Sequence, residues 1–284
     1  MRMAQRVRIV TDSTADIPPQ LAREAGIEVV PLSVRFGNKI YRDDLDLSKD
    51  EFYAMLKAAP DLPTTSVPPP GAFARVYQAA VDSGLQVLSI HLSSALSGTY
   101  NTAILAASAF ENGKVLVVDS RNCSMAMGWV ALMAAEQARA GAPMETIMAM
   151  VEDMLPRAHL YAALDTLENL RRGGRIGRAA AFLGTVLNVK PIVTIADGVV
   201  TPVEKVRLLN RALVRLVEIA QSHAPIQRMA VAHTDAPETV ARLRAMVAEA
   251  MPELELITYR AGATVGTLAG AGAVALVFLS GRRT

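Results

Sequence analysis

One segment indicates the fold class: L-Q-V-L-S-I-H-L-S-S-A-L-S-G-T-Y-N-T-A-I-L-A-A-S-A-F, residues 85–110. Its apolar beginning, residues 85–91, predicts a buried strand, and residues 97–110 predict a helix. Only a short serine-rich loop separates the two. A strand that passes through a short loop into a helix is the building unit of layered α/β proteins, in which parallel strands alternate with helices.

The same alternation continues in both directions along the chain. Before this segment we expect strands at 7–10, 28–36 and 39–42 and helices at 48–58 and 73–81, and after it a strand at 114–119 and helices at 125–139 and 144–155. Pro156 precedes a second series, with strands expected at 159–164, 191–195, 199–203, 229–233, 253–259 and 273–278. The helices of this series are expected at 166–172, 208–223 and 237–250, with another that follows the glycine turn at 173–177 and extends to Leu187. The sequence therefore predicts two α/β domains, residues 1–157 and 158–284, with a ligand site between them.

The composition excludes several classes of protein. The 284 residues are 51% hydrophobic and carry a net charge of +2, so neither disorder nor a basic nucleic-acid surface is expected. A single cysteine, Cys123, rules out an internal disulfide and a thiolate zinc cluster. Only 5% of the residues are aromatic, while 13 are methionine. Such an interior is aliphatic and adaptable.

One segment imitates a membrane span. Residues 261–281 include no charged side chain. Within this segment, Gly262, Gly266 and Gly270 repeat at the four-residue spacing at which small residues line the contact between two membrane helices. Glycine weakens a helix by about 1 kcal/mol for each residue. We therefore expect a buried glycine-rich turn followed by a strand at 273–278, without stable membrane insertion. The first ten residues contain no apolar run typical of a secretory signal, and a cytoplasmic protein is expected.

Hydroxyl groups gather where the predicted strands end. In the 91–99 loop, Ser94, Ser97 and Gly98 precede a helix, and free N–H groups at a helix N-terminus beside hydroxyls favour a phosphate or a carboxylate. Helix capping explains the same residue types equally well. Residues 61–71 contain four prolines and predict a stiff extended loop that holds Thr65 and Ser66, or a surface linker with incidental hydroxyls.

Motifs of self-sufficient catalysis are missing. The sequence contains no phosphate-binding G-x-x-x-x-G-K-[ST] loop and no G-x-S-x-G elbow, and its four histidines lack metal-ligand spacing. His91 and His233 end apolar strands, which favours structural hydrogen bonding, although either could serve as a base. The basic glycine loop R-R-G-G-R-I-G, residues 171–177, predicts contact with a phosphate or an acidic partner, or a solvated helix end.

Taken together, these segments resemble the DegV family of fatty-acid-binding proteins, which includes the B subunits of bacterial fatty acid kinase. The matching motifs occur in the family's order and span nearly the whole chain: V-T-D-S-T-A-D at 10–16, P-L-S-V at 31–34, T-S-V-P at 65–68, H-L-S-S-A-L-S-G-T-Y at 91–100, L-R-R-G-G-R-I at 170–176 and L-N-V-K-P-I at 187–192.

The resemblance implies a non-catalytic carrier. It implies that the carboxylate of a long-chain fatty acid is held by Thr65 and Ser97, with Ser66, Ser94 and Gly98 in the same loops. It also implies that a separate ATP-binding kinase subunit converts this carboxylate into an acyl phosphate for phospholipid synthesis. No cofactor other than the bound lipid is implied.

The resemblance further implies that Arg175, with Arg172, faces the kinase partner. The sequence departs from the family near its end, where Leu268 and Ala271 stand at positions that are commonly His and Pro. This departure concerns the kinase role more than lipid binding. The alternative is a self-sufficient small-molecule kinase, or a serine hydrolase that uses Ser97, of related α/β architecture.

Overall fold

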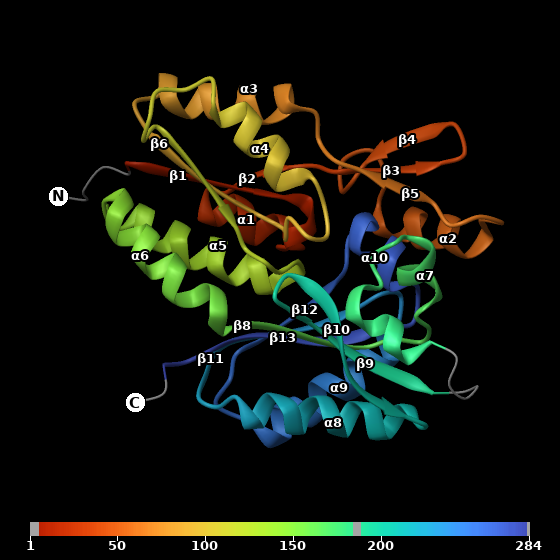
Figure 1. The fold of residues 1–284 in the computed structure, drawn as a ribbon. Helices are drawn as coiled ribbons and strands as arrows, with labels where there is room; N and C mark the ends of the chain where they lie inside the picture. The colour runs from red at the N-terminus through yellow and green to blue at the C-terminus, as the bar shows by residue number, and fades with distance from the viewer. Residues whose placement is uncertain (1–5, 184–188, 283–284) are drawn as a thin grey trace.

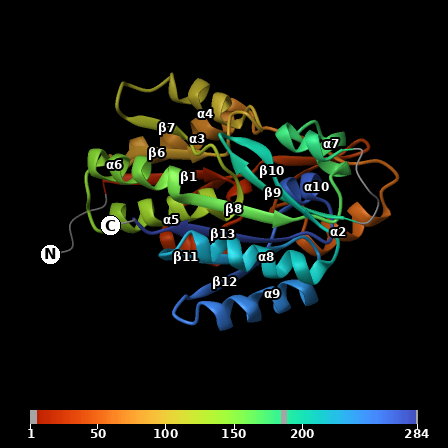
Figure 2. The same ribbon diagram turned by 60° about the horizontal axis from the view of Figure 1, so that its bottom comes forward.

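The computed structural model describes residues 6–183 and 189–282. Two large sheets lie one above the other with helices outside and between them, and a smaller sheet lies beside them (Figure 1). From one outer face to the other, the layers are helices α3 and α4, the first sheet, helix α5, the second sheet, and helices α8 and α9 (Figure 2). The expected α/β architecture is confirmed.

The first sheet is parallel throughout and contains, in spatial order, β2 (Glu28–Val30), β1 (Val7–Asp12), β6 (Gln86–His91) and β7 (Val115–Asp119). Helices α3 (Pro70–Asp82) and α4 (Thr99–Ala107) cover one face, where Phe73 and Tyr77 are fully buried. Helix α5 (Ser124–Arg139) covers the other face, flanked by α1 (Pro19–Ala25) and α6 (Met144–Met154). Because all four strands run the same way, their carboxyl ends meet at one edge, where ligands bind in such sheets.

The second sheet is mixed, which corrects the expectation of parallel layers in both halves. Its order is β10 (Val199–Val206), β9 (Lys190–Ala196), β8 (Ala158–Ala163), β13 (Val274–Ser280), β11 (Ile226–His233) and β12 (Leu256–Arg260). Only β11 and β12 pair in parallel. Helices α8 (Leu209–Ser222) and α9 (Pro237–Ala250) cover one face, and α5 contacts the other at β8 and β13. Helix α5 is therefore buried between two sheets, which explains its apolar sequence.

The small antiparallel sheet has the order β4 (Lys39–Arg42), β3 (Ser33–Phe36), β5 (Thr64–Ser66). Helix α2 (Lys49–Ala58) packs beside it and begins with a capping box between Ser48 and Glu51. Strand β5 lies within residues 61–71, for which no strand was expected. Proline is tolerated next to an edge strand because one side of that strand needs no partner, and the prolines flank β5 without interrupting it.

Residues 261–281 form a short helix and a strand. Helix α10 (Ala263–Ala269) replaces the expected glycine-rich turn, and all seven residues of β13 are buried between its sheet neighbours. Within residues 6–183 and 189–282, no helix is both long and apolar enough to span a membrane.

The remaining described elements are short: α7 (Glu168–Arg172) and the 3₁₀ helices η1 (Ser13–Ala15), η2 (Leu155–Arg157) and η3 (Gly177–Phe182). The expected helix reaching Leu187 is thus a 3₁₀ turn through Phe182, and Leu187 lies outside the described residues. Every strand after residue 157 belongs to the six-stranded sheet, but α5 contacts both large sheets. The division at 157/158 into two domains stays a prediction.

Candidate functional site

A cavity of about 140 Å³ lies between the carboxyl edge of the parallel sheet and the inner face of the six-stranded sheet. Its wall is mostly aliphatic, with a few hydroxyl groups and one arginine. The lining residues are Thr14, Leu32, Thr65, Leu92, Leu96, Ser97, Cys123, Ser124, Leu160, Ala162, Leu164, Leu170, Arg175, Val193, Thr194, Ile195, Val200, Ala232, His233, Thr234, Tyr259, Ala261, Thr264, Val265, Leu268, Ala269, Ala273, Val274 and Ala275.

Thr65 and Ser97, which lie far apart in the sequence, line this one cavity. Thr65 pairs with the buried residue Val34 in the β5–β3 register, and its neighbours on β5 are exposed. Side chains alternate along a strand, so Thr65 turns inward while Ser66 turns out. The Ser97 hydroxyl lies 3.0 Å from the Thr99 hydroxyl and accepts the Thr99 N–H at 3.3 Å, at the start of α4. Both residues therefore contribute to the wall of the same cavity.

The other serine and glycine candidates lie outside the cavity wall. The Ser94 hydroxyl donates to the Asp119 carboxylate at 2.6 Å and is exposed. Ser66 is exposed, and Gly98 is the exposed residue that precedes α4, where an added Cβ would meet Val67 at 3.8 Å. Gly98 therefore leaves room beside the loop that carries Thr65.

Arg175, which the family resemblance assigns to a partner-facing surface, lines the cavity. Its Nε donates to the Leu96 carbonyl at 3.0 Å and its Nη1 donates to the Gly173 carbonyl at 2.7 Å. A hollow adjoins the cavity and shares Thr65, Arg175 and Leu268 with it, and we call this shared end the mouth of the cavity. Arg172 lines only this hollow. The guanidinium of Arg175 is thus fixed at the cavity mouth, next to the Ser97 loop.

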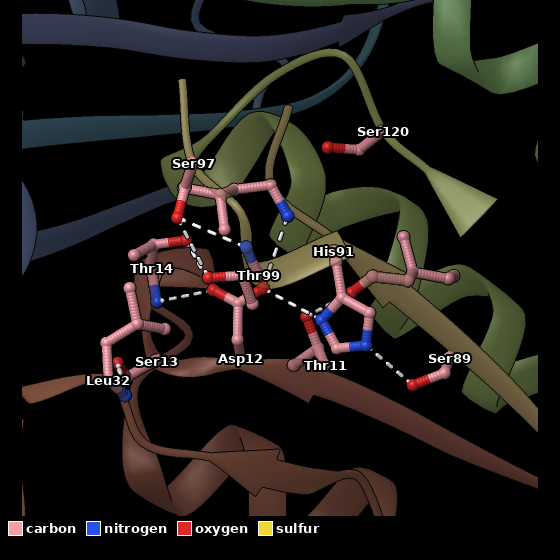
Figure 3. A network of polar contacts seen from close by, with 12 residues as sticks. Thr11, Asp12, Ser13, Thr14, Leu32, Ser89, His91, Ser97, Thr99 and Ser120 are labelled. Atoms are coloured by element: carbon pink, nitrogen blue, oxygen red, sulfur yellow. Dashed lines mark hydrogen bonds and ion pairs between the residues drawn. The ribbon is translucent and has the colours of Figure 1, made fainter. Parts of the chain in front are cut away.

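A buried hydrogen-bond network supports the mouth from behind (Figure 3). The Asp12 carboxylate accepts the Thr14 N–H at 3.0 Å and the Thr14 hydroxyl, and its other oxygen lies 2.9 Å from His91 Nδ1. His91 Nε2 lies 2.7 Å from the Ser89 hydroxyl, to which the Tyr77 hydroxyl donates at 2.8 Å. These contacts fix the ends of β1 and β6, and with them the loops that carry Thr14 and Ser97.

A hydrolase triad is hydrogen-bonded in the order Asp–His–Ser, and Asp12, His91 and Ser89 follow this order. Unlike a hydrolase triad, they are not accessible to a ligand in the cavity. All three side chains are fully buried, and none of them lines the cavity. Ser97, the serine that the hydrolase alternative requires, contacts Thr99 rather than a histidine among its described bonds. The described residues also contain no group of three or more potential metal ligands. The buried Asp12, His91 and Ser89 therefore do not reach the cavity.

A second buried network connects the cavity wall with helix α10. The Asp16 carboxylate accepts the Ser124 hydroxyl at 2.5 Å and the Gly262 N–H at 2.8 Å, and the Ser124 hydroxyl lies 2.6 Å from that of Tyr259. Burial raises the pKa of Asp16 to about 7, against the lowering effect of Lys49 and these hydrogen bonds. Burial also raises the pKa of Tyr259 well above its usual value. Ser124 and Tyr259 thus remain neutral hydroxyls within the wall.

Asp43 holds the first turn of α10. Its carboxylate accepts the N–H groups of Ala263 and Thr264 at 2.8 and 3.0 Å. A negative charge at a helix N-terminus is favourable because the N–H groups there lack helical partners. Residues 264, 265, 268 and 269 of α10 consequently line the cavity, with Leu268 at the mouth.

Sequence reasoning missed several lining groups: Thr14, Ser124, Tyr259, Thr264 and the position of Leu268 on a helix. The motif at residues 10–16 and the strand-end rule point to Thr14, because it follows β1 directly. Tyr259, Ser124 and Thr264 carry no local signal, since long-range contacts bring them to the cavity.

Comparison with known proteins gives a consistent result. The model of the DegV family of uncharacterised proteins matches residues 6–281. The protein DegV of Bacillus subtilis is 36% identical over 274 residues, which cover 95% of this chain and 98% of that protein. A DegV domain-containing protein of Streptomyces coelicolor is 38% identical over 283 residues, covering 98% of this chain and all of the relative (100%).

Solved structures agree with this match along the full chain. The structure of a fatty-acid-binding DegV family protein of Thermus thermophilus has a TM-score of 0.90 and 36% identity, covering 97% of this chain and 99% of its own. The structure of DegV of Bacillus subtilis, a fatty acid binding protein, has a TM-score of 0.88 and 35% identity, covering 98% and 100%.

Proposed function

Because this chain belongs to the DegV family, we propose that it binds one long-chain fatty acid in the cavity between its two large sheets, with the carboxylate held by Thr65 and Ser97. The observation that carries the proposal is that these two hydroxyls line one cavity whose wall is mostly aliphatic. Fatty acid binding by the solved relatives from Thermus thermophilus and Bacillus subtilis supports it.

The acyl chain supplies most of the affinity. A fatty acid with ~14 methylenes, at roughly 0.8 kcal/mol for each one buried, offers about 11 kcal/mol of gross transfer free energy. Association and ordering reduce this value by about 4 kcal/mol or more, and the hydrogen bonds of the head group add to what remains. Leucine, valine and alanine side chains of the six-stranded sheet, together with leucines from the loops that follow β2 and β6, supply the wall that such a tail needs.

The head group supplies orientation. Hydroxyl donors hold a carboxylate without the strong bidentate pairing that an arginine would give, so one oxygen stays nucleophilic. Arg175 donates to two backbone carbonyls, which hold its guanidinium at the mouth. Its positive charge then lies near the carboxylate, while the hydroxyls of Thr65 and Ser97 keep their hydrogen bonds to the carboxylate oxygens.

The proposal extends to a carrier that does not itself catalyse a reaction. A separate ATP-binding kinase subunit would dock at the hollow beside the mouth, and the carboxylate oxygen would attack the γ-phosphorus of its ATP. The acyl phosphate forms and ADP leaves. Arg172 and Arg175, which line this hollow, support a partner surface there. Such a role belongs to the cytoplasm, where ATP is available, and treats residues 1–157 and 158–284 as two domains that enclose the lipid.

Displacement of a fluorescent fatty acid from the lipid-free chain tests the head-group assignment. Thr65→Val with Ser97→Ala is expected to weaken octadecanoate binding by about a hundredfold or more, because each of the two hydrogen bonds to a charged group contributes ~1.5–3 kcal/mol. Ser66→Ala is the matched control, since Ser66 is exposed on the same strand. Unchanged affinity in the double variant would refute the assignment, and no binding by the unchanged chain would refute the proposed function.

A further inference from the structure

One polar group in the cavity wall has no use in the proposed head-group site. Thr264, in the first turn of α10, lines the cavity and is only 4% exposed. Its hydroxyl oxygen has no hydrogen-bond partner among the described residues. A buried hydroxyl without a partner is unfavourable, so such groups in native proteins usually serve a ligand or hold a water molecule.

Helix α10 relates Thr264 to the mouth. Thr264 and Leu268 are four residues apart and both line the cavity, whereas Gly266 packs tightly against Tyr53, where an added Cβ would lie 2.6 Å from the Tyr53 hydroxyl. Leu268 also lines the hollow at the mouth, which Thr264 does not. Four residues of helix advance about 6 Å along the helix axis, so Thr264 lies about one helical turn away from Leu268 at the mouth.

A second polar group lines the same cavity. His233, at the end of β11, accepts the Ala236 N–H on Nδ1 at 3.0 Å. A neutral imidazole that accepts on Nδ1 carries its proton on Nε2. Burial and the nearby cations Arg260 and Lys49 lower the pKa of His233 against the opposing effect of Asp235, which favours this neutral form. None of the hydrogen bonds described for the chain involves Nε2 of His233.

We infer that Thr264 and His233 form a polar subsite for an oxygen function within the acyl chain, which makes hydroxy fatty acids a preferred ligand class. The inference rests on the proposed function. An extended chain advances roughly 1.2 Å for each bond. The ~6 Å between the mouth and Thr264 therefore corresponds to about five bonds beyond the carboxyl carbon. The favoured oxygen is on or near carbon 6, where the Thr264 hydroxyl can accept or donate and His233 can donate.

The test compares octadecanoate with its 3-, 6- and 12-hydroxy derivatives by calorimetric titration of the lipid-free chain. The unchanged chain is expected to bind the 6-hydroxy acid about two- to tenfold more tightly than octadecanoate, the gain of one added hydrogen bond. The 12-hydroxy acid, whose oxygen lies beyond the subsite, is expected to show no gain.

Thr264→Val is the decisive variant. The Thr264 hydroxyl has no partner among residues 6–183 and 189–282, so the isosteric valine removes no described bond and the fold is expected to tolerate it. The preference for the 6-hydroxy acid should fall to onefold or below, while octadecanoate binds as before or more tightly. Thr267→Val is the control on the same helix: Thr267 donates to the Ala263 carbonyl at 2.8 Å and lines the hollow at the mouth but not the cavity, so this variant should keep the preference for the 6-hydroxy acid.

The outcomes separate the two proposals. Octadecanoate binding without any preference for the 6-hydroxy acid, or an equal preference in Thr264→Val, would overturn the subsite and leave the fatty acid site intact. The subsite is also overturned if Thr267→Val loses the preference as Thr264→Val does. Failure of the unchanged chain to bind any of the four acids would overturn both proposals.

Discussion

Replacing Asp16 by Asn is expected to remove a large pH dependence of stability between about pH 4 and pH 7. The Asp16 side chain lies between the two large sheets, with 2% of the residue exposed, and accepts hydrogen bonds from Ser124 and Gly262. Burial raises its pKa to about 7. An unfolded aspartate titrates near 3.9. Asparagine keeps the shape and one acceptor oxygen but does not titrate.

The sign follows from proton binding. Between about pH 4 and pH 7 the folded chain keeps a proton on Asp16 that the unfolded chain releases, so the free energy of unfolding falls as the pH rises. At 1.36 kcal/mol for each pH unit, the interval from about 3.9 to about 7 corresponds to about 4 kcal/mol. The contribution of protonated Asp16 is full below pH 4 and is lost as the pH passes through 7.

Urea unfolding of the lipid-free chain from pH 4.5 to 7.5 measures this effect. The free energy of unfolding should fall by about 3 to 4 kcal/mol more in the unchanged chain than in Asp16→Asn. Asp61→Asn is the control, because the side chain of Asp61 is 92% exposed, and it should keep the original slope. The reasoning is refuted if Asp16→Asn keeps the slope of the unchanged chain.

Two further substitutions test the packing that shapes the cavity. Gly266→Ala places a Cβ 2.6 Å from the Tyr53 hydroxyl and 2.8 Å from a Phe52 ring carbon. Thermal unfolding should therefore show that the free energy of unfolding falls by about 1–3 kcal/mol. An unchanged midpoint would contradict the tight contact of α10 with α2. Ala162→Phe fills the wall of the cavity at β8. A phenyl ring that excludes four methylenes should weaken octadecanoate binding by about 3 kcal/mol and leave the affinity for decanoate unchanged. Displacement titrations with both acids measure this difference. Equal losses of affinity for the two acids would contradict an acyl tail at this wall.

The residues that could be predicted from sequence are those whose roles follow from local pattern. The strand, serine loop and helix at residues 85–110 form as predicted, with α4 beginning at Thr99. The joint use of Thr65 and Ser97 was expected only from the family resemblance, because the spacing of two loops says nothing about their contact. The structure brings both to one cavity, and their contact with a carboxylate remains a proposal.

Long-range contacts explain what local pattern missed. The glycines at 262, 266 and 270 predicted a turn, but Asp16 and Asp43 hold the N–H groups at the start of α10, and Gly266 lets the helix approach Tyr53. Strand β5 forms because β3 supplies a neighbour for a proline-flanked segment. Thr264 becomes a cavity residue only through α10, so no signal in the sequence singled it out.

Native mass spectrometry of the chain, purified without added lipid or detergent, measures directly whether the cavity holds a fatty acid. We expect one long-chain fatty acid bound to each chain, released on denaturation and identified by its mass. Retention should fall when Thr65→Val and Ser97→Ala are combined. A chain that carries no acyl chain as purified, and stays unloaded after incubation with octadecanoate, would contradict the claim that the cavity between the sheets is a fatty acid site.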